Sequence, residues 1–425
     1  MKVIEGVQAA LAWCEERRAV GGFDAEVDAA VADIIDQVAE RGDDALLELT
    51  QRFDGARLDA VEVPAAELLR RAERVPAALA AAIDLAISRV TAFYEAQREH
   101  GFETTARGVR LGQIVTPLAS VGCYVPGGTA PLFSSLVMTA VPAKVAGVDR
   151  IVAATPPDRT GSVPDEVAYV ATALGLESVV LAGGAQAIAA LALGTRSVQR
   201  VDKVVGPGNR YVTAAKRRLF GVVGIEALAG PTETLVLADD SASVRHVIAD
   251  LLAQAEHDGA QPVLVTTSRE LAGAVLAEIE QAAADLPTAA TALASLADRG
   301  VVVHVADVEE GLAVLNAFAP EHACLLVEDA RTVARGIVNA GGIFIGEHSL
   351  EALGDYLAGP SHVMPTGGTA RFASFVNLRD FQKVVPFLEV DASFVAEVGP
   401  SAALLARAEG LEAHARAIES RLQQE

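Results

Sequence analysis

The 425-residue sequence lacks the features that direct a chain to a membrane, to nucleic acid or out of the cell. No stretch offers the roughly 18 uninterrupted apolar residues of a membrane span, because Asp84, Ser88 and Arg89 interrupt the most apolar segment, residues 76–96. The start, "MKVIEGVQAALAWCEERR", has acidic residues where a signal peptide is basic and then apolar. A formal net charge of −22 disfavours phosphate backbones and anionic lipids. We therefore expect a cytoplasmic protein with a small-molecule ligand, and neither nucleic acid nor a membrane as partner.

Cysteine is scarce, and the glycine fingerprint of dinucleotide-binding folds is missing. The three cysteines, Cys14, Cys123 and Cys324, lie far apart among apolar neighbours and form no C-x-x-C pair, which favours reduced, structural thiols. Neither Cys123 nor Cys324 has the cationic neighbours that activate a thiolate nucleophile. No strand is followed by G-x-G-x-x-G, so a nucleotide would have to be held by different turns.

Apolar residues make up 51% of the chain, enough for two or more packed domains. Helical spacing of Val27, Val31, Ile34 and Val38 predicts a surface helix from Asp24 to Arg41, and a second helix is expected from Pro76 toward residue 99. Two blocks of short Val- and Ile-rich strands alternating with helices then follow. The expected strands cover residues 121–125, 150–155, 178–182, 202–206, 234–239, 262–267, 301–305, 323–327 and 342–346. Hydrophobic strands of this kind are typical of parallel sheets covered on both faces.

This alternation predicts an α/β protein with two doubly wound, incomplete Rossmann-like domains facing a cleft, plus small helical N- and C-terminal segments. The boundary between the two blocks is expected near residues 225–232. The last 45 or so residues are mostly helical and too short for a core of their own, so we expect them to pack on something else, for example a second copy of the chain.

Three glycine turns follow carboxyl ends of strands and open helices, where free backbone N–H groups meet a ligand. They are Pro126-Gly127-Gly128, Gly183-Gly184-Ala185-Gln186 and Gly206-Pro207-Gly208-Asn209. Three such turns in one block indicate a nucleotide-sized ligand, although each alone could be an ordinary tight turn.

Gln254 and His257 stand one turn apart at the end of the helix that contains "LLAQAEHDG". Their i, i+3 spacing turns both side chains the same way, so they could share a ligand or an ion. With Asp355 and another histidine they form an oxygen and nitrogen set that suits zinc. The alternative is that His257 only interacts with its own helix dipole.

Glu321 and His322 occur in "FAPEHACLL", where a proline turn enters a strand. A neutral imidazole can accept a proton near neutral pH, and a carboxylate beside it supplies a second base. The pair therefore indicates two proton transfers, although "EH" without its context is common.

Taken together, these segments resemble the histidinol dehydrogenase family from the first helices to the tail. The resemblance rests on "YVPGGTAPLFSS", "GGAQAIAALALGT", "VDKVVGPGNRYV", "AGPTETLV", "LLAQAEHD", "NAFAPEH", "GDYLAGPSHVMPT" and "EGLEAHARAI", which occur in the family's order. It implies oxidation of L-histidinol to L-histidine through the aldehyde, by two hydride transfers to NAD. It also implies one Zn²⁺ per subunit and a homodimer with shared active sites.

The resemblance assigns a role to each matching residue. The implied catalytic residues are His322, as the base for the alcohol, and Glu321, as the activator of water. The implied metal ligands are Gln254, His257, Asp355 and His414, the last from the partner chain. The implied substrate contacts are Thr232, Gln254, His257, His322, Asp355, His362, Glu409 and His414, and the implied NAD contacts are Tyr124, Gln186 and Asn209.

The resemblance also implies a division of the chain. Residues 1–20 form an N-terminal helical arm, residues 21–123 and 231–376 a zinc and substrate domain, residues 124–230 the NAD-binding domain, and residues 377–425 a helical dimerisation tail.

Three other functions remain open on the sequence. Thr232 stands where the family commonly has serine, Ser361 where asparagine is frequent, and Leu350 where proline is common. These departures leave room for a paralogue that oxidises another small polar alcohol, such as a sulfonated diol. A zinc hydrolase would explain the metal residues but not the glycine turns, and a two-lobed binding protein would need no base.

Overall fold

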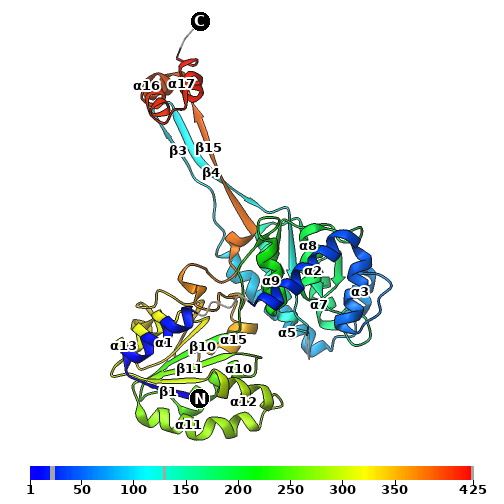
Figure 1. Cartoon of the computed structure of the whole chain (residues 1–425), viewed down its shortest axis with the longest axis vertical. Coiled ribbons are helices and arrows are strands. Elements are labelled where there is room, and N and C mark those ends of the chain that lie inside the picture. The colour runs from blue at the N-terminus through cyan, green and yellow to red at the C-terminus, as the bar shows by residue number, and fades with distance from the viewer. Residues whose placement is uncertain (20–23, 128–130, 423–425) are drawn as a thin grey trace.

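The computed structural model describes residues 1–19, 24–127 and 131–422. Two α/β lobes lie side by side, and a long arm of β-strands rises from between them and ends in two helices (Figure 1). Gly128, part of one predicted ligand turn, lies outside the described residues.

The first lobe is built on a six-stranded sheet in the order β2-β7-β6-β5-β8-β9. Its strands are β2 Glu62–Pro64, β5 Ser120–Tyr124, β6 Arg150–Thr155, β7 Ser178–Leu181, β8 Lys203–Val205 and β9 Gly224–Ile225. All neighbours are parallel except β2, which pairs antiparallel with β7. The parallel winding begins at β5 and runs outward through β6 and β7, and the chain then returns to β8 and β9 on the other side of β5. The topological switch point therefore lies between β5 and β8.

Eight helices belong to this lobe. They are α2 Ala25–Arg41, α3 Asp43–Asp54, α4 Ala65–Ala72, α5 Ala77–Glu95, α6 Phe133–Ala146, α7 Asp165–Leu174, α8 Gly184–Leu193 and α9 Arg210–Leu219. They cover both faces of the sheet, so that two separate buried clusters form, one centred on α6 and α7 and one on α2, α8 and α9. Burial on both faces explains why these strands are apolar throughout.

The second lobe repeats the same winding on a sheet in the order β1-β12-β11-β10-β13-β14. Its strands are β1 Lys2–Glu5, β10 Glu233–Ala238, β11 Gln261–Thr266, β12 Val301–His304, β13 His322–Leu326 and β14 Gly342–Ile345, all parallel. Its helices are α1 Val7–Ala19, α10 Val244–Ala255, α11 Arg269–Ala284, α12 Ala289–Asp298, α13 Val308–Phe318, α14 Ala330–Ala334 and α15 Glu351–Tyr356. The switch point of this sheet lies between β10 and β13.

The arm is a three-stranded antiparallel sheet in the order β15-β4-β3, made of Gln382–Val390, Val109–Pro117 and Glu103–Ala106. Its tip carries α16 Ala392–Ala408 and α17 Glu412–Glu419, which pack on each other away from both lobes (Figure 1). The arm exposes large apolar side chains on its strands and its helices. They include Ile114, Val384, Leu388, Leu404 and Leu405. Such an apolar surface is typical of a protein interface.

The predicted α/β class, with two doubly wound sheets, is confirmed. The expected domain boundaries differ from the segments that build each lobe. Residues 21–123 were grouped with 231–376, whereas α2 to α5 pack on helices of the first lobe and β5 lies at the centre of its sheet. Residues 1–19 are not an arm, because β1 pairs with β12 and α1 packs on α13. Residues 377–425 are not wholly helical, since they include the nine-residue strand β15.

The first predicted helix is confirmed in detail. Asp24 caps α2 by accepting from the backbone N–H groups of Glu26 and Val27, and the apolar stripe that includes Val31 is buried. The apolar spacing and the Asp24 cap are the signals from which the helix was predicted, and the helix ends at Gly42, whose φ of 56° favours glycine.

Among the described helices, α5 alone has the length and apolar composition that could cross a membrane. It also carries polar side chains that tie it to the rest of the fold. Asp84 accepts a hydrogen bond from Tyr169, and Arg89 donates to the backbone carbonyl of Leu357. Buried Tyr94 donates to the carbonyl of Val376, so α5 is bound to segments far away in the sequence.

Candidate active site

Glu321 and His322 lie at the start of β13, beside the start of β10. The turn before them contains Ala319, whose φ of 55° is unusual for a residue with a side chain and brings the chain out of α13. His322 is in register with Thr234 of the neighbouring strand. The pair therefore occupies the amino edge of the second sheet at its switch point, whereas ligands of doubly wound sheets usually meet the carboxyl edge.

His322 is buried and held in one orientation. Its Nδ1 lies 3.1 Å from the backbone carbonyl of Glu233, so Nδ1 carries the proton and donates to that oxygen. Among the described residues, Nε2 is buried without a hydrogen-bond partner. Burial is the largest cause that lowers the pKa of His322 to about 4; nearby His362 and His257 contribute to the shift, and the hydrogen bond to Glu233 opposes it. Its Nε2 is thus a neutral nitrogen with a free lone pair, as a general base requires.

Glu321 is held by donors on one carboxylate oxygen. Oε2 accepts from Thr232 Oγ1 at 2.6 Å and from the backbone N–H of Glu233 at 3.0 Å. Burial raises the pKa of Glu321 to about 8 in the polypeptide alone, and the two hydrogen bonds oppose that shift. A divalent cation nearby would lower the pKa and favour the ionised form.

Gln254, His257 and Asp355 have donor atoms to spare. The amide nitrogen of Gln254 donates to Thr232 Oγ1, which leaves the amide oxygen for a ligand. Only backbone atoms of His257 and Asp355 take part in hydrogen bonds with described residues, so the imidazole and the carboxylate are uncommitted. Burial without a compensating donor raises the pKa of Asp355 to about 6. These groups fit a cation, which would offset the desolvation of the carboxylate.

The carboxyl end of α10 also favours the binding of a cation. Gln254 lies in its last turn and His257 just beyond it, where the partial negative charge of the helix carboxyl terminus favours a cation. Within the described part of the chain, no group of three or more His, Cys, Asp or Glu side chains could hold a metal ion. Of the four predicted ligands, only His257 and Asp355 are of these residue types and belong to the second lobe. The second lobe by itself therefore does not form a complete metal centre.

His362 joins the two lobes beside this site. Its Nδ1 lies 3.0 Å from the backbone oxygen of Asp355, and its Nε2 lies 3.4 Å from the hydroxyl of Ser135 on α6. Burial lowers its pKa to about 4, and His257 contributes to the shift. The predicted substrate contacts Thr232, Gln254, His257, His322, Asp355 and His362 are therefore linked by contacts and electrostatic interactions around one site.

Glu409 and His414 are not brought to this site. Glu409 caps the end of α16 and His414 lies in α17, both exposed at the tip of the arm (Figure 1). One chain therefore carries two separate parts of the predicted site.

The three predicted NAD contacts surround the switch point of the first sheet at its carboxyl edge. Tyr124 ends β5, and its hydroxyl accepts from the backbone N–H of Gly184 at the start of α8. Gln186 is buried in the first turn of α8, where the helix dipole favours an anion. Asn209 caps α9 through its amide oxygen, so its amide nitrogen can donate to a ligand.

Gly206 allows the turn before Asn209 to approach this edge. Its φ is 124°, and a Cβ there would lie 2.2 Å from the backbone oxygen of Tyr124. Lys216 and Glu226 form a buried ion pair, and both bond to the backbone of Gly206. The turn that carries Asn209 is therefore rigidly supported.

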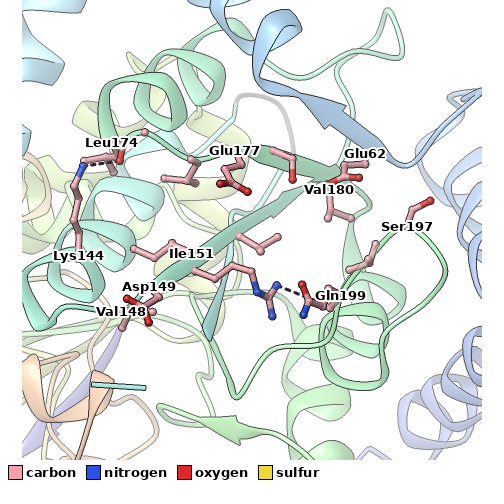
Figure 2. A pocket seen from close by; sticks show the side chains of 16 residues that line it. Glu62, Lys144, Val148, Asp149, Ile151, Leu174, Glu177, Val180, Ser197 and Gln199 are labelled. Atoms are coloured by element: carbon pink, nitrogen blue, oxygen red, sulfur yellow. Dashed lines mark hydrogen bonds between the residues drawn. The ribbon is translucent and has the colours of Figure 1, made fainter. Parts of the chain in front are cut away.

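Two hollows in the described structure lie away from these residues. The larger, about 540 Å³, opens at the amino ends of β6 and β7, and its lining includes Glu62, Lys144, Asp149 and Glu177 (Figure 2). Lys144 already donates to the carbonyl of Leu174 (Figure 2). The smaller lies at the amino end of β12, near Lys2 and Gly300. Neither contains a residue predicted to bind substrate, metal or NAD.

Sequence reasoning missed Glu233 and Glu351, which flank His322. Glu233 supplies the carbonyl that orients the ring, and the buried carboxyl of Glu351 lies 3.8 Å from Nδ1. Burial raises the pKa of Glu351 well above its ordinary value. Glu233 occurs inside the quoted motif "AGPTETLV", and Glu351 lies three residues before "GDYLAGPSHVMPT", but a carboxylate close to a named residue gave no separate signal.

Two doubly wound lobes with a buried glutamate–histidine pair at one switch point and glycine turns at the other define an enzyme of the dehydrogenase class. The family model for histidinol dehydrogenase matches residues 18–422, and the chain belongs to this family. It is an oxidoreductase.

Relatives support the assignment along nearly the whole chain. Histidinol dehydrogenase of Deinococcus radiodurans is 56% identical over 92% of this chain and 89% of its own length. That of Halalkalibacterium halodurans is 48% identical over 93% and 94%. The crystal structure of histidinol dehydrogenase from Elizabethkingia anophelis superposes with a TM-score of 0.93 at 34% identity, covering 99% of this chain and 98% of that one.

Proposed function

We propose that this protein oxidises L-histidinol to L-histidine through L-histidinaldehyde, the last step of histidine biosynthesis, in the cytoplasm. The observation that carries the proposal is the pair formed by Glu321 and His322. The imidazole of His322 is fixed through Nδ1, and its Nε2 has no partner among the described residues. The carboxylate of Glu321 lies beside it, and the backbone of Glu233 binds both groups.

NAD would supply the hydride acceptor for both oxidations, held by Tyr124, Gln186 and Asn209 at the carboxyl edge of the first sheet. Zn²⁺ would orient the substrate, held by Gln254, His257 and Asp355 together with His414 from a second chain. The spare amide oxygen of Gln254 and the uncommitted groups of His257 and Asp355 support this assignment.

His322 takes the proton of the alcohol at Nε2 as the first hydride leaves. The carbonyl of Glu233 stabilises the imidazolium through Nδ1. Glu321, once ionised, takes a proton from the water that adds to the aldehyde carbon. Removal of that proton leaves the hydrate as an anion. The anion loses the second hydride to give the carboxylic acid, which releases its proton to solvent and becomes the carboxylate. Each chain thus contributes one base for each oxidation.

A homodimer with shared sites would complete the substrate pocket. The support is the position of Glu409 and His414 at the tip of an arm that projects from the lobes, together with the exposed apolar side chains along that arm. The arm of one chain would thereby bring both residues to the lobes of the other.

The test is a steady-state assay of the zinc-loaded protein with NAD, scoring reduced cofactor per molecule of product. With L-histidinol we expect two reduced cofactors per histidine. A panel of other amino alcohols and sulfonated diols runs in parallel. Preference for one of these, or hydrolysis in the absence of NAD, would overturn the proposal.

A further inference from the structure

Glu233, the first residue of β10, contacts both proposed bases through its backbone. Its N–H donates to Oε2 of Glu321 at 3.0 Å, and its carbonyl accepts from Nδ1 of His322 at 3.1 Å. The N–H and C=O of one strand residue point to the same side of the strand. A shift of this single residue would therefore move both bases at once.

The side chain of Glu233 is anchored in the interior. It is 4% exposed, and its Oε1 accepts from the guanidinium of Arg17 and, at 3.1 Å, from the backbone N–H of Gly367. Burial raises the pKa of Glu233, and the charge of Arg17 opposes the shift. A buried carboxylate of this kind needs its donors to stay in place.

Arg17 is itself fixed by the body of the second lobe. Its guanidinium donates to the carbonyl of Phe318 at 3.1 Å and to the side chain of Gln261 at 3.2 Å, and lies 3.9 Å from the centre of the Phe318 ring. Phe318 ends α13, and Trp13 of α1 stacks on it. A continuous set of contacts thus runs from the N-terminal helix to the two bases.

We infer that Arg17 and Glu233 are positioning residues that align Glu321 and His322 together. The inference rests on the proposed function, because it assigns the two bases to successive oxidations of one substrate. Neither Arg17 nor the side chain of Glu233 contacts the reacting atoms. Their effect reaches the reaction through the backbone of residue 233.

The test compares Arg17→Met with Arg18→Met. Methionine at position 17 keeps an unbranched apolar side chain that reaches about as far as Nε of arginine, but removes the guanidinium and every donor. Arg18 is an exposed neighbour on the same helix. We expect Arg17→Met to lower kcat for histidinol and for histidinaldehyde by the same factor, about 10- to 100-fold. KM for both substrates and the zinc content should stay within about twofold of wild type, and Arg18→Met should match wild type.

A second readout does not depend on turnover. In ¹⁵N-histidine spectra, the hydrogen-bonded Nδ1–H resonance of His322, assigned with His322→Gln, should shift in Arg17→Met and stay unchanged in Arg18→Met. Should Arg17→Met fail to fold by circular dichroism, the double variant Arg17→Met/Glu233→Gln removes the buried charge and is measured in the same way. Conservative Arg17→Lys should recover part of kcat.

The outcomes separate the two proposals. A wild-type protein without histidinol oxidation contradicts the proposed function, and the spectra then decide the inference alone. An active wild type with unchanged kcat and spectra in folded Arg17→Met overturns the inference. So does an effect on KM alone, or on only one of the two oxidations.

Discussion

The hydroxyl of Thr232 donates to the carboxylate of Glu321 at 2.6 Å and accepts from the amide of Gln254, so one side chain connects the water-activating group to the candidate metal site. Serine could form the same two bonds. Compared with serine, Thr232 adds only a methyl group, which leaves both hydrogen bonds of the hydroxyl intact.

Glu321→Gln should separate the two oxidations. The amide can still accept from Thr232 and Glu233 but cannot take a proton from water. We expect histidine formation to fall by about 10²–10⁴, with oxidation of histidinol to the aldehyde retained. Product analysis by chromatography under single-turnover conditions measures both steps, with exposed Glu328→Gln as control. Equal losses in both steps would contradict separate roles for the two bases.

Neither buried cysteine near the sheets should be needed for turnover. Burial raises the pKa of Cys123 to about 12 and that of Cys324 well above its ordinary value, so neither thiol is ionised at neutral pH. Cys123→Ala and Cys324→Ala should each keep kcat within about threefold of wild type and lose roughly 1 kcal/mol of unfolding free energy. Urea titration and the steady-state assay measure the two effects. Loss of aldehyde oxidation in a folded variant would instead indicate a thiol nucleophile.

Asn209 has two separable roles. Its oxygen caps α9, while its amide nitrogen is proposed to donate to NAD. Asn209→Asp keeps the cap and should raise the KM for NAD with little loss of stability. Asn209→Ala should also cost about 1 kcal/mol of unfolding free energy. Calorimetric titration with NADH gives the affinity directly. Unchanged cofactor affinity in both variants would remove Asn209 from the cofactor site.

Two inactive variants should restore activity when mixed. His257→Ala removes a proposed zinc ligand from the lobes, and His414→Ala removes one from the arm. If each site combines the lobes of one chain with the arm of another, mixed dimers formed by unfolding and refolding together contain one intact site. We expect about a quarter of wild-type activity from an equal mixture. No recovery, with mixed dimers verified by mass spectrometry, would contradict shared sites.

The two bases should affect stability with opposite dependence on pH in zinc-free protein. Folding lowers the pKa of His322 from 6.5 to about 4. As the pH falls from 6.5 toward 4, the unfolded chain therefore binds a proton at this residue and the folded protein does not, so wild type loses stability relative to His322→Gln. Glu321 has a raised pKa, about 8 against 4.5, so wild type loses stability relative to Glu321→Gln as pH rises through that window. Melting temperatures from pH 4 to 8 measure both differences. Parallel curves would show that neither group is desolvated.

The sequence predicted the alternation of strands and helices well because hydrophobic strands and capped helices are local signals. Every strand expected in the two blocks is present, with no end shifted by more than one residue, as 178–182 became Ser178–Leu181. Assigning α2 to α5 to a lobe failed because an amphipathic helix shows which face is buried but not which sheet covers it. The hairpin of β3 and β4 was missed because its residues are mostly exposed, so no alternation of buried positions appears.

The candidate site was predictable where a residue type carries chemistry by itself. Glu321, His322 and the group around Gln254 were found because imidazole, carboxylate and amide side chains suit bases and metal ligands. Glu233 was missed because its contacts to both bases use backbone atoms, which every residue has. Such a role depends on strand register and becomes visible only in the fold.

The pairing of β1 with β12 has a consequence for synthesis on the ribosome. Lys2–Glu5 is synthesised before the first lobe, yet Val301–His304, its partner strand, follows almost 300 residues later. The segments of the first lobe lie between them and can close their sheet while the leading strand still waits. Nascent chains stalled shortly before residue 300 should therefore contain the closed sheet of the first lobe and a strand β1 that still lacks its partner.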